Sequence, residues 1–403
     1  MVYKVIGLMS GSSLDGLDIA YVHLSQAGRG WEFQLIHTEC YGYPPEWAER
    51  LAGATGLSAL DYQLLHTEYG HFVGREVRRF MAAYGLEYQV QLIASHGHTT
   101  FHDPARRMTA QLGDGAAIAA GTGINVVSDL RAMDVALGGQ GAPIVPIGEK
   151  LLFLGLAAFL NLGGIANVSV GARTVTGPGV TGAAMAGRAA PAMTGSVVSG
   201  PGVAGPGVAG PGVSGPAAFD VAPANRVLNA LARKAGLDFD RDGLLAAAGK
   251  VDEGLLGRLN ALPYYGMGWP KSLANEFGLK EVLPLVEGAG LSAEDGLRTY
   301  VEHLVVQIGR AVERLRVGAE APAKMLVTGG GAHNGYLIGR LRAKLAELGV
   351  EVVVPDAAIV DYKEALVMAL IGVLRWREEN NVLASVTGAS RDSVGGAVWM
   401  GGQ

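Results

Sequence analysis

Residues 5–24 read VIGLMSGSSLDGLDIAYVHL: an apolar stretch, a turn of small and acidic residues, and a second apolar stretch. This pattern predicts two buried strands joined by a polar turn at residues 10–16. A second stretch of the same design, AAFLNLGGIANVSV at residues 157–170, has Gly163 and Gly164 at its turn. Two such hairpins, one in each half of the chain, are typical of a duplicated two-domain fold.

The first turn has groups that suit a phosphate site. Gly11 and Gly16 permit backbone conformations that other residues resist, and three serines supply hydroxyl groups. Backbone N–H groups in such a turn can face a phosphate while the carboxylates of Asp15 and Asp18 face a hydrated metal ion. An ordinary hairpin turn without a ligand is the alternative, and the turn alone does not decide between them.

The composition indicates a globular chain with large hydrophobic cores. Of the 403 residues, 49% are hydrophobic and 17% are charged, and this length suits two domains. The net charge of −5, with acidic and basic residues interspersed, argues against a nucleic-acid-binding surface. Cys40 is the only cysteine, so an internal disulfide is excluded and a reducing compartment is expected. The sequence shows no signal-peptide pattern, and its longest apolar run is too short to span a bilayer, so a soluble cytoplasmic protein is expected.

Strands and helices alternate through most of the chain, which predicts an α/β fold. In the first part, strands are expected at residues 3–9, 17–25, 32–37, 91–95 and 124–128, and helices at residues 58–84 and 113–121. In the last part, a strand–turn–helix unit is expected at residues 217–236, a helix at 291–315, a second strand–turn–helix unit at 324–348, a strand at 351–354, a helix at 362–376 and a closing strand at 393–400. The glycine-rich passage LGGQGAP at residues 137–143 is interpreted as a crossover between domains.

Residues 175–216 lack any helical or strand periodicity. The sequence GPGV occurs four times there, the last three times in strict five-residue register. Proline removes a backbone donor and glycine raises the entropy cost of ordering, so the segment has little to bury and no ladder to join. A mobile surface insertion is predicted, with an elastin-like role as the alternative.

Glycines also precede the predicted helix of the 324–348 unit. TGGGAHN at residues 328–334 follows an apolar strand, and its N–H groups and the helix dipole favour an anionic or nucleotide ligand. Tight packing of the strand against the helix is the alternative, and the spacing differs from the GxGxxG dinucleotide pattern. GMGWPKS at residues 266–272 invites comparison with a P-loop. However, Pro270 stands where a glycine N–H is needed, so the P-loop hypothesis is rejected.

One motif is rich in histidine. SHGHTTFHD at residues 95–103 supplies His96, His98 and His102. These side chains suit either a metal site or a polar substrate pocket. No fourth metal ligand is evident, which favours the pocket.

Two aspartate-containing motifs follow the insertion. Asp220 ends the strand of the AFDV motif, where it can act as a base in a cleft or cap the following helix. DFDRDG at residues 238–243 begins like a calcium-binding loop. Gly249 stands where that loop requires a bidentate glutamate, so calcium is excluded.

The motifs occur together and in a specific order along the chain: GLMSGSSLDGLD, SHGHT, QLGD, SDLRAMD, GGQGAPIVP, LNLGGIANVS, AFDVAPAN, FDRDG, WPKS, TGGGAHN and SVTGAS. As a set they resemble the anhydro-N-acetylmuramic acid kinase family of the sugar kinase/actin/heat-shock ATPase superfamily. The resemblance covers nearly the whole chain except roughly residues 172–216. It implies a two-domain actin-like ATPase fold of the ribonuclease H-like α/β class, with ATP and sugar in the interdomain cleft. We expect domain I to comprise residues 1–140 and 385–403, and domain II residues 141–384.

The resemblance also implies roles for individual residues. The expected ATP-binding residues form two hairpin turns and the glycine turn: Gly11, Ser12, Ser13, Leu14, Asp15, Gly16, Leu17, Asp18, Asn161, Gly163, Gly164, Asn167, Gly329, Gly330 and Gly331. Asp220 matches the catalytic base, and Thr99, Arg131 and Glu364 match sugar-binding positions. Asp15 and Asp18 are expected to hold Mg²⁺ through water.

The implied reaction is ATP-dependent opening of 1,6-anhydro-N-acetylmuramic acid to give N-acetylmuramic acid 6-phosphate in cell-wall recycling. Three departures from the family pattern lie near the sugar: APAN at residues 222–225, PKSLANE at residues 270–276, and His98 in place of glutamine. A kinase for a related amino sugar and a non-catalytic sugar sensor are therefore alternatives. The expected partners are ATP and the sugar, without nucleic acid or membrane, and a homodimer is left open.

Overall fold

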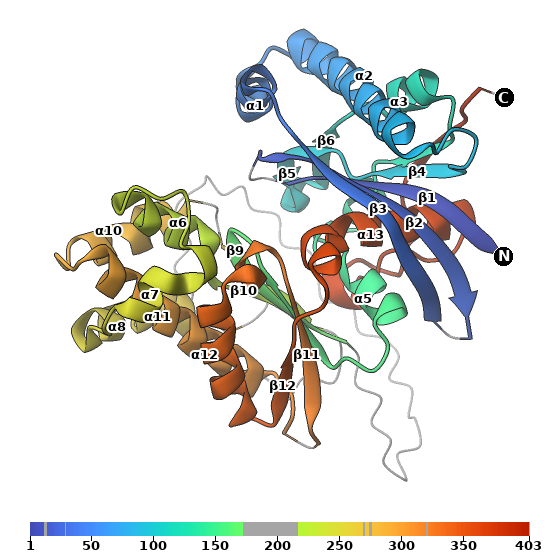
Figure 1. Cartoon of the computed structure of the whole chain (residues 1–403). Helices are drawn as coiled ribbons and strands as arrows, with labels where there is room; N and C mark the ends of the chain where they lie inside the picture. Colours follow the sequence, from blue (N-terminus) through green and yellow to red (C-terminus); the bar gives the residue numbers. More distant parts are fainter. Residues whose placement is uncertain are drawn as a thin grey trace, which may run out of the picture.

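The computed structural model describes residues 1–11, 14–28, 30–171, 217–268, 271–273, 276–319 and 321–402, and the structural statements below concern these residues. The predictions made for Ser12, Ser13, Pro270 and the 175–216 insertion lie outside them. The chain forms two α/β halves, each built around its own sheet (Figure 1). No helix in these ranges combines the length and the apolar character that crossing a bilayer requires.

The first sheet has six strands in the order β13-β7-β4-β1-β2-β3. They are β1 (Val2–Ser10), β2 (Gly16–Ala27), β3 (Gly30–Gly42), β4 (Leu92–Ser95), β7 (Val126–Ser128) and β13 (Ala397–Trp399). Strands β1, β2 and β3 form an antiparallel meander, and β4 runs parallel to β1 and to β7.

The second sheet repeats this design in the order β10-β9-β8-β11-β12. Its strands are β8 (Ala158–Leu162), β9 (Ile165–Val170), β10 (Ala217–Pro223), β11 (Ala323–Thr328) and β12 (Val350–Val353). Again three strands form an antiparallel meander, and the first of them pairs in parallel with the fourth. The repeated connectivity confirms the predicted duplicated α/β fold.

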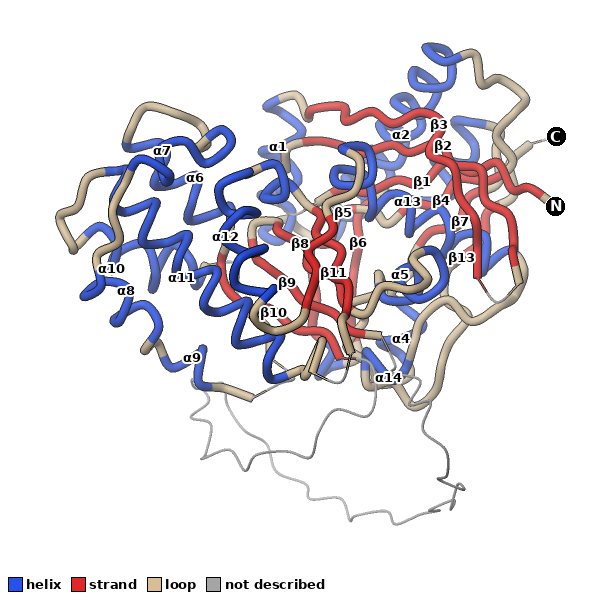
Figure 2. Tube along the Cα trace, turned by 60° about the horizontal axis from the view of Figure 1, so that its bottom comes forward, coloured by secondary structure: helices blue, strands red, loops and turns tan. Residues whose placement is uncertain are grey.

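Helices cover the sheets, and a small hairpin of β5 (His98–Asp103) and β6 (Met108–Leu112) extends the first half. The helices before the second sheet are α1 (Pro45–Ala52), α2 (Ala59–Tyr84), α3 (Gly115–Thr122), α4 (Ala132–Ala136) and α5 (Pro146–Leu152). The helices that follow β10 in the chain are α6 (Asn225–Lys234), α7 (Leu244–Ala248), α8 (Glu253–Asn260), α9 (Pro263–Gly266), α10 (Leu283–Glu287), α11 (Ala293–Arg314), α12 (Gly335–Ala346), α13 (Ala357–Trp376) and α14 (Ala384–Thr387). Figure 2 shows α6, α8, α10 and α11 gathered on the side of the second sheet that faces away from the first half.

Period-two alternation in β1 divides the first half into two cores. Ile6 packs with α2, whereas its neighbour Val5 packs with α13 on the opposite face. Helix α13 is apolar around most of its circumference, which suits a helix buried on more than one side. A Cβ on Gly7 would overlap the carbonyl oxygen of Ala365, and a Cβ on Gly372 would lie 2.5 Å from the Cβ of Ala94. These two glycines therefore allow α13 to approach the sheet at backbone contact.

The packing differs from the expected domain boundaries. Residues 141–384 were expected in the second domain, yet α5 and α13 within that range pack on the first sheet. The physical reason is the apolar surface of α13, which is buried against β1, β2 and β4 near the beginning of the chain. The order of the elements along the chain does not predict that α13 packs on the first sheet.

Candidate active site

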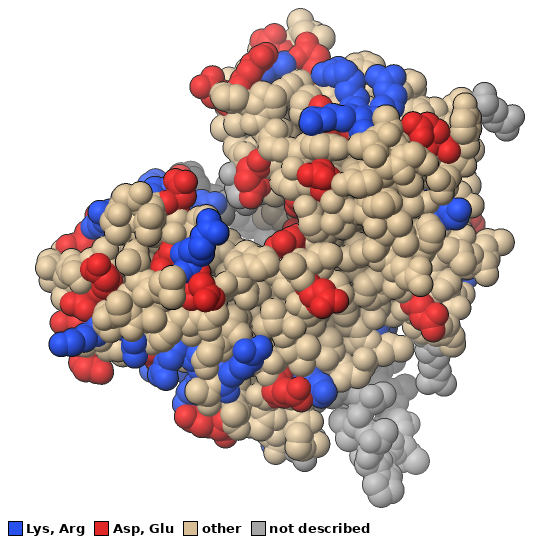
Figure 3. Space-filling view, viewed as in Figure 1, with Lys and Arg blue, Asp and Glu red and all other residues tan. Residues whose placement is uncertain are grey.

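A cavity of about 240 Å³ lies between the two halves. Its walls come from α5, α13 and the segment around α4 on one side, and from β8 and β9 on the other. The lining residues are Arg131, Ala142, Pro143, Ile144, Val145, Pro146, Glu149, Phe159, Asn161, Asn167, Ser169, Lys363 and Glu364. The surface is hollowed between the halves on the face drawn in Figure 3.

Arg131 enters the cavity from the residue that precedes α4. Its Nε donates to Nε2 of His96 across 2.8 Å, and its Nη1 donates to the carbonyl oxygen of Gly141 across 2.6 Å. Burial lowers the pKa of Arg131 to about 10, and the carboxylates of Glu364 and Asp134 oppose that effect. The guanidinium is therefore a half-buried cation held by neutral acceptors.

Glu364 reaches the cavity from α13. Its Oε1 accepts a hydrogen bond of 3.2 Å from Nδ2 of Asn161, which lies on β8. This bond joins a helix packed on the first sheet to a strand of the second sheet. Of the expected sugar-binding residues, Arg131 and Glu364 thus line one cavity, whereas Thr99 is not among its lining residues.

Asp220 on β10 is held by both of its carboxylate oxygens. Oδ1 accepts from Nδ2 of Asn167 at 2.9 Å, and Oδ2 accepts from the backbone N–H of Leu273 at 2.8 Å. The carbonyl oxygen of Asp220 also accepts from the hydroxyl of Tyr264 at 2.6 Å. Helix α6 begins after Ala224 without a side-chain cap, so the helix-capping interpretation of Asp220 is wrong. Since Asn167 lines the cavity, Asp220 lies one hydrogen bond from its wall.

Lys271 lies beside this aspartate. Its Nζ is 4.3 Å from the ring centre of Tyr264, and its carbonyl oxygen accepts from the N–H of Asp220. Burial and the charge of Arg314 lower the pKa of Lys271 to about 8, and the Asp220 carboxylate opposes this. Residues 271–273 therefore place a cation, Lys271, and an N–H donor, Leu273, near Asp220.

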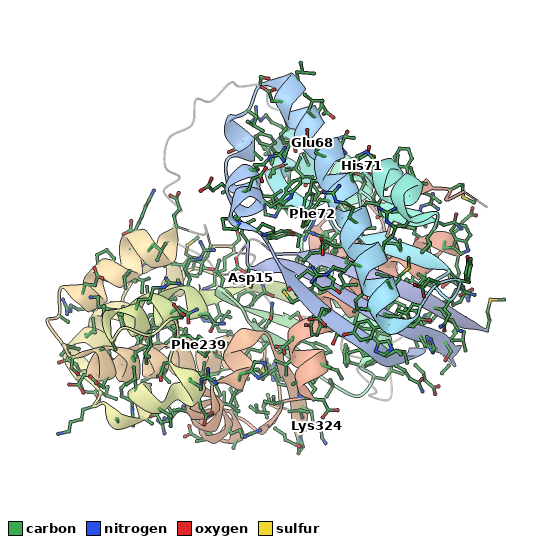
Figure 4. All side chains as sticks on the ribbon, turned by 45° about the horizontal axis from the view of Figure 1, so that its top comes forward. Asp15, Glu68, His71, Phe72, Phe239 and Lys324 are labelled. Atoms are coloured by element: carbon green, nitrogen blue, oxygen red, sulfur yellow. The ribbon has the colours of Figure 1, made fainter. Side chains whose placement is uncertain are left out.

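The first turn brings carboxylates to the edge of the first half. Figure 4 shows Asp15 on the side of that half which faces the second. Asp18 on β2 points to the α13 side of the sheet, the side of Ala20 and Val22. Burial raises the pKa of Asp18 to about 6; a hydrogen bond with Cys40 opposes this, and the charges of Asp15, Glu364 and Asp361 reinforce it.

The glycine turn at residues 329–331 contacts the end of β8, directly before the second hairpin turn. A Cβ on Gly329 would overlap Oδ1 of Asn161, and one on Gly331 would lie 2.7 Å from the Cβ of Leu162. Gly329 has a φ of 82°, which favours glycine. The glycine turn at residues 329–331 thus packs tightly against the end of β8, whatever else it binds.

The N-terminus of α12 was expected to favour an anionic ligand, but side chains of this chain already accept hydrogen bonds from its N–H groups. Asp242 accepts a 2.9 Å hydrogen bond from the N–H of Gly335, and Asn334 caps the N–H of Leu337. A carboxylate of the chain itself therefore occupies the helix end that was expected to favour an anionic ligand. Asp240 from the same DFDRDG motif caps the N–H groups of Leu245 and Ala246. The motif that resembles a calcium loop is a pair of helix caps.

The three histidines of the SHGHTTFHD motif have separate partners. Nδ1 of His98 lies 3.2 Å from Oγ of Ser10, and Nδ1 of His102 lies 3.1 Å from Oγ1 of Thr109. His96 binds Arg131 and Gly97. Within the described ranges, no three histidine, cysteine or acidic side chains gather closely enough to hold a metal ion directly.

One cluster in the cavity wall was missed in the sequence. Glu149 on α5 accepts from Nζ of Lys363 at 2.9 Å and also from the hydroxyl of Ser169 on β9. The Lys363 and Glu149 side chains are only 4% and 6% exposed. A charged pair at the start of an otherwise apolar helix, YKEALVMAL, was the only signal of this cluster in the sequence.

Known proteins match this chain over nearly its full length. A family model described as anhydro-N-acetylmuramic acid kinase matches residues 3–183 and 178–401. The anhydro-N-acetylmuramic acid kinase of Vibrio parahaemolyticus is 33% identical over 96% of this chain and 95% of that protein. The enzyme of the same name from Streptomyces coelicolor is 34% identical over 99% of this chain and 94% of that protein. Among solved structures, the activator of the 2-hydroxyisocaproyl-CoA dehydratase from Clostridium difficile aligns with a TM-score of 0.36 and 15% identity, over 94% of this chain and 96% of that one.

Proposed function

The chain belongs to the anhydro-N-acetylmuramic acid kinase family, and we propose that it uses ATP to convert 1,6-anhydro-N-acetylmuramic acid into N-acetylmuramic acid 6-phosphate. The observation that carries this proposal is the composition of the cavity wall. Arg131 and Glu364 face Asn161 and Asn167 across the cavity, and Asn167 orients the Asp220 carboxylate. A sugar in the cavity would therefore meet polar groups from both halves.

Asp220 is proposed as the general base. It would take a proton from water as the water oxygen attacks the anomeric carbon of the anhydro sugar. The bond from that carbon to the six-position oxygen breaks, and this oxygen attacks the γ-phosphate of ATP, releasing ADP. Each carboxylate oxygen of Asp220 already accepts one hydrogen bond, which fixes its orientation, and each retains a lone pair for the proton.

ATP is proposed to lie along the three glycine-containing turns. The first of these turns joins β1 to β2 of the first sheet, whereas the other two follow β8 and β11 of the second sheet, so the nucleotide would bridge the halves. The close contact of the 329–331 turn with Asn161 and Leu162 supports a single surface there. Thr99 remains a proposed sugar contact from the β5–β6 hairpin.

Mg²⁺ is proposed to bind near Asp15 and Asp18 through water. The donor chemistry fits, because Mg²⁺ prefers oxygen ligands and commonly retains several waters beside one or two carboxylates. The raised pKa of Asp18 reflects burial and crowding by Asp15, Glu364 and Asp361, a repulsion that a divalent cation would relieve. When bound, the ion would neutralise charge on the phosphates.

A coupled ADP-release assay on a panel of sugars tests the function. We expect turnover with 1,6-anhydro-N-acetylmuramic acid and none with free N-acetylmuramic acid or N-acetylglucosamine. In H₂¹⁸O, mass spectrometry should find the label on the anomeric oxygen of the product. Turnover of the free sugars alone would indicate a kinase without ring hydrolysis, and absence of ADP release with every sugar would contradict the proposal.

A further inference from the structure

His96 is buried beside the cavity, and its hydrogen bonds define its tautomer. Nδ1 lies 2.8 Å from the carbonyl oxygen of Gly97, and a carbonyl can only accept. Nδ1 therefore has the proton. Gly97 has a φ of 71°, and a Cβ there would lie 2.5 Å from the carbonyl oxygen of Leu112, so glycine is required for this turn.

With the proton on Nδ1, Nε2 has a free lone pair directed to Arg131. Nε of Arg131 donates to it across 2.8 Å, as expected for a guanidinium and a neutral imidazole. Burial and the charge of Arg131 lower the pKa of His96 to about 3. The ring is therefore a neutral acceptor throughout the physiological pH range.

The choice of acceptor determines what Arg131 can offer to a ligand. Nε and Nη1 are used by His96 and Gly141, whereas Nη2 has no hydrogen-bond partner among the described residues. Glu364 and Asp134 are close enough to influence Arg131. The hydrogen bonds of these carboxylates go to other groups, however: Glu364 accepts from Asn161, and Asp134 accepts from the N–H of Gly141 and the hydroxyl of Thr387. A neutral histidine orients the guanidinium without cancelling its charge, as a paired carboxylate would.

We infer that His96 is a positioning residue for the sugar: as a neutral acceptor it fixes Arg131 so that Nη2 and the positive charge of the guanidinium serve a substrate oxygen. The inference rests on the proposed function for the identity of the sugar. The geometry of His96 does not depend on that function, because its tautomer and its contact with Arg131 are set within the chain itself.

Two substitutions separate the two hydrogen bonds of His96. His96→Gln can place an amide oxygen near the position of Nε2 and so retain an acceptor for Arg131. His96→Asn can place its amide near Nδ1 and retain the donor to Gly97, but it does not reach Arg131. Both shorten or reshape the same buried side chain, so they control for each other. His71→Asn, at an exposed histidine of α2, controls for loss of an imidazole (Figure 4).

We expect His96→Asn to raise the KM for the anhydro sugar roughly 10- to 100-fold, because a hydrogen bond to a charged group is lost. The KM for ATP should change less than about twofold, and His96→Gln should recover most of the sugar affinity. Equal sugar KM values in both variants, whether raised or unchanged, would overturn the inference.

A spectroscopic measurement tests the positioning role without substrate. Imidazole ¹⁵N shifts of the wild-type protein should show His96 protonated on Nδ1 and unchanged between pH 5 and 8. The Arg131 Nε–H signal should exchange slowly in the wild type and His96→Gln and rapidly in His96→Asn. An Nε2–H tautomer, or His96 titration within that range, would overturn the inference, whereas a wild type inactive on the anhydro sugar would contradict only the proposed function.

Discussion

Nδ2 of Asn167 donates a 2.9 Å hydrogen bond to Oδ1 of Asp220, and the two residues face each other across the antiparallel pair of β9 and β10. The bond joins the proposed base to the cavity wall. A register shift between Asp220 and Ala222 follows directly, which marks an irregularity of the sheet at this point.

Replacing Asp220 by asparagine should lower kcat about 10²- to 10⁴-fold, because the shape is retained and the base is removed. Nucleotide affinity, measured by calorimetry, should remain nearly unchanged. Asp238→Asn, at an exposed aspartate, is the matched control. An Asp220→Asn enzyme that keeps more than about a tenth of the wild-type rate would rule out the base assignment.

The buried Lys363–Glu149 pair should be important for stability. Lys363→Met leaves Glu149 buried without its cation, and we expect about 3–5 kcal/mol of destabilisation in urea unfolding. Lys324→Met removes an ion pair with Glu351 whose side chains are more than half exposed, and it should cost less than about 1 kcal/mol (Figure 4). Similar losses in the two variants would show that the Lys363 pair is not effectively buried.

Glycine substitutions distinguish packing from nucleotide binding. Gly329→Ala should destabilise the fold, because its φ is 82° and the new Cβ would overlap Asn161. At Gly330 the nearest atom to a new Cβ is 3.5 Å away, so the chain itself has room for a side chain. We therefore expect Gly330→Val to raise the KM for ATP strongly while the melting temperature changes little. An unchanged KM for ATP would mean that the nucleotide does not lie against this turn.

The carboxyl of Asp18 should make stability depend on pH. Its folded-state pKa of about 6 exceeds the ordinary value of 3.8, so the folded chain binds the proton more tightly between these values. The resulting stabilisation is present below pH 4 and is lost as the pH rises through 6. Asp18→Asn should therefore gain stability relative to the wild type between pH 4 and 8, by roughly 1–3 kcal/mol, while losing activity. Parallel pH profiles for the two proteins in urea unfolding would contradict this.

The periodic elements were predicted well from sequence, and non-local contacts were not. The 58–84 helix prediction corresponds to α2 at Ala59–Tyr84, because apolar residues recur along it at helical spacing. The β5–β6 hairpin was missed because its histidines, threonines and arginines give no clear alternation of apolar and polar residues. No local pattern could pair Lys363 with Glu149, since 214 residues separate them.

Helix α13 is connected in sequence to the second sheet, packs on the first, and supplies Lys363 and Glu364 to the cavity between them. Neither half can consequently be cut out as an independent unit at a single chain break. A fragment ending before residue 357 would leave the Val5–Val22 face of the first sheet bare, and a fragment starting at residue 141 would expose the apolar helix. A chimera that exchanges halves between relatives would have to transplant residues 357–376 together with the N-terminal half to keep the fold soluble.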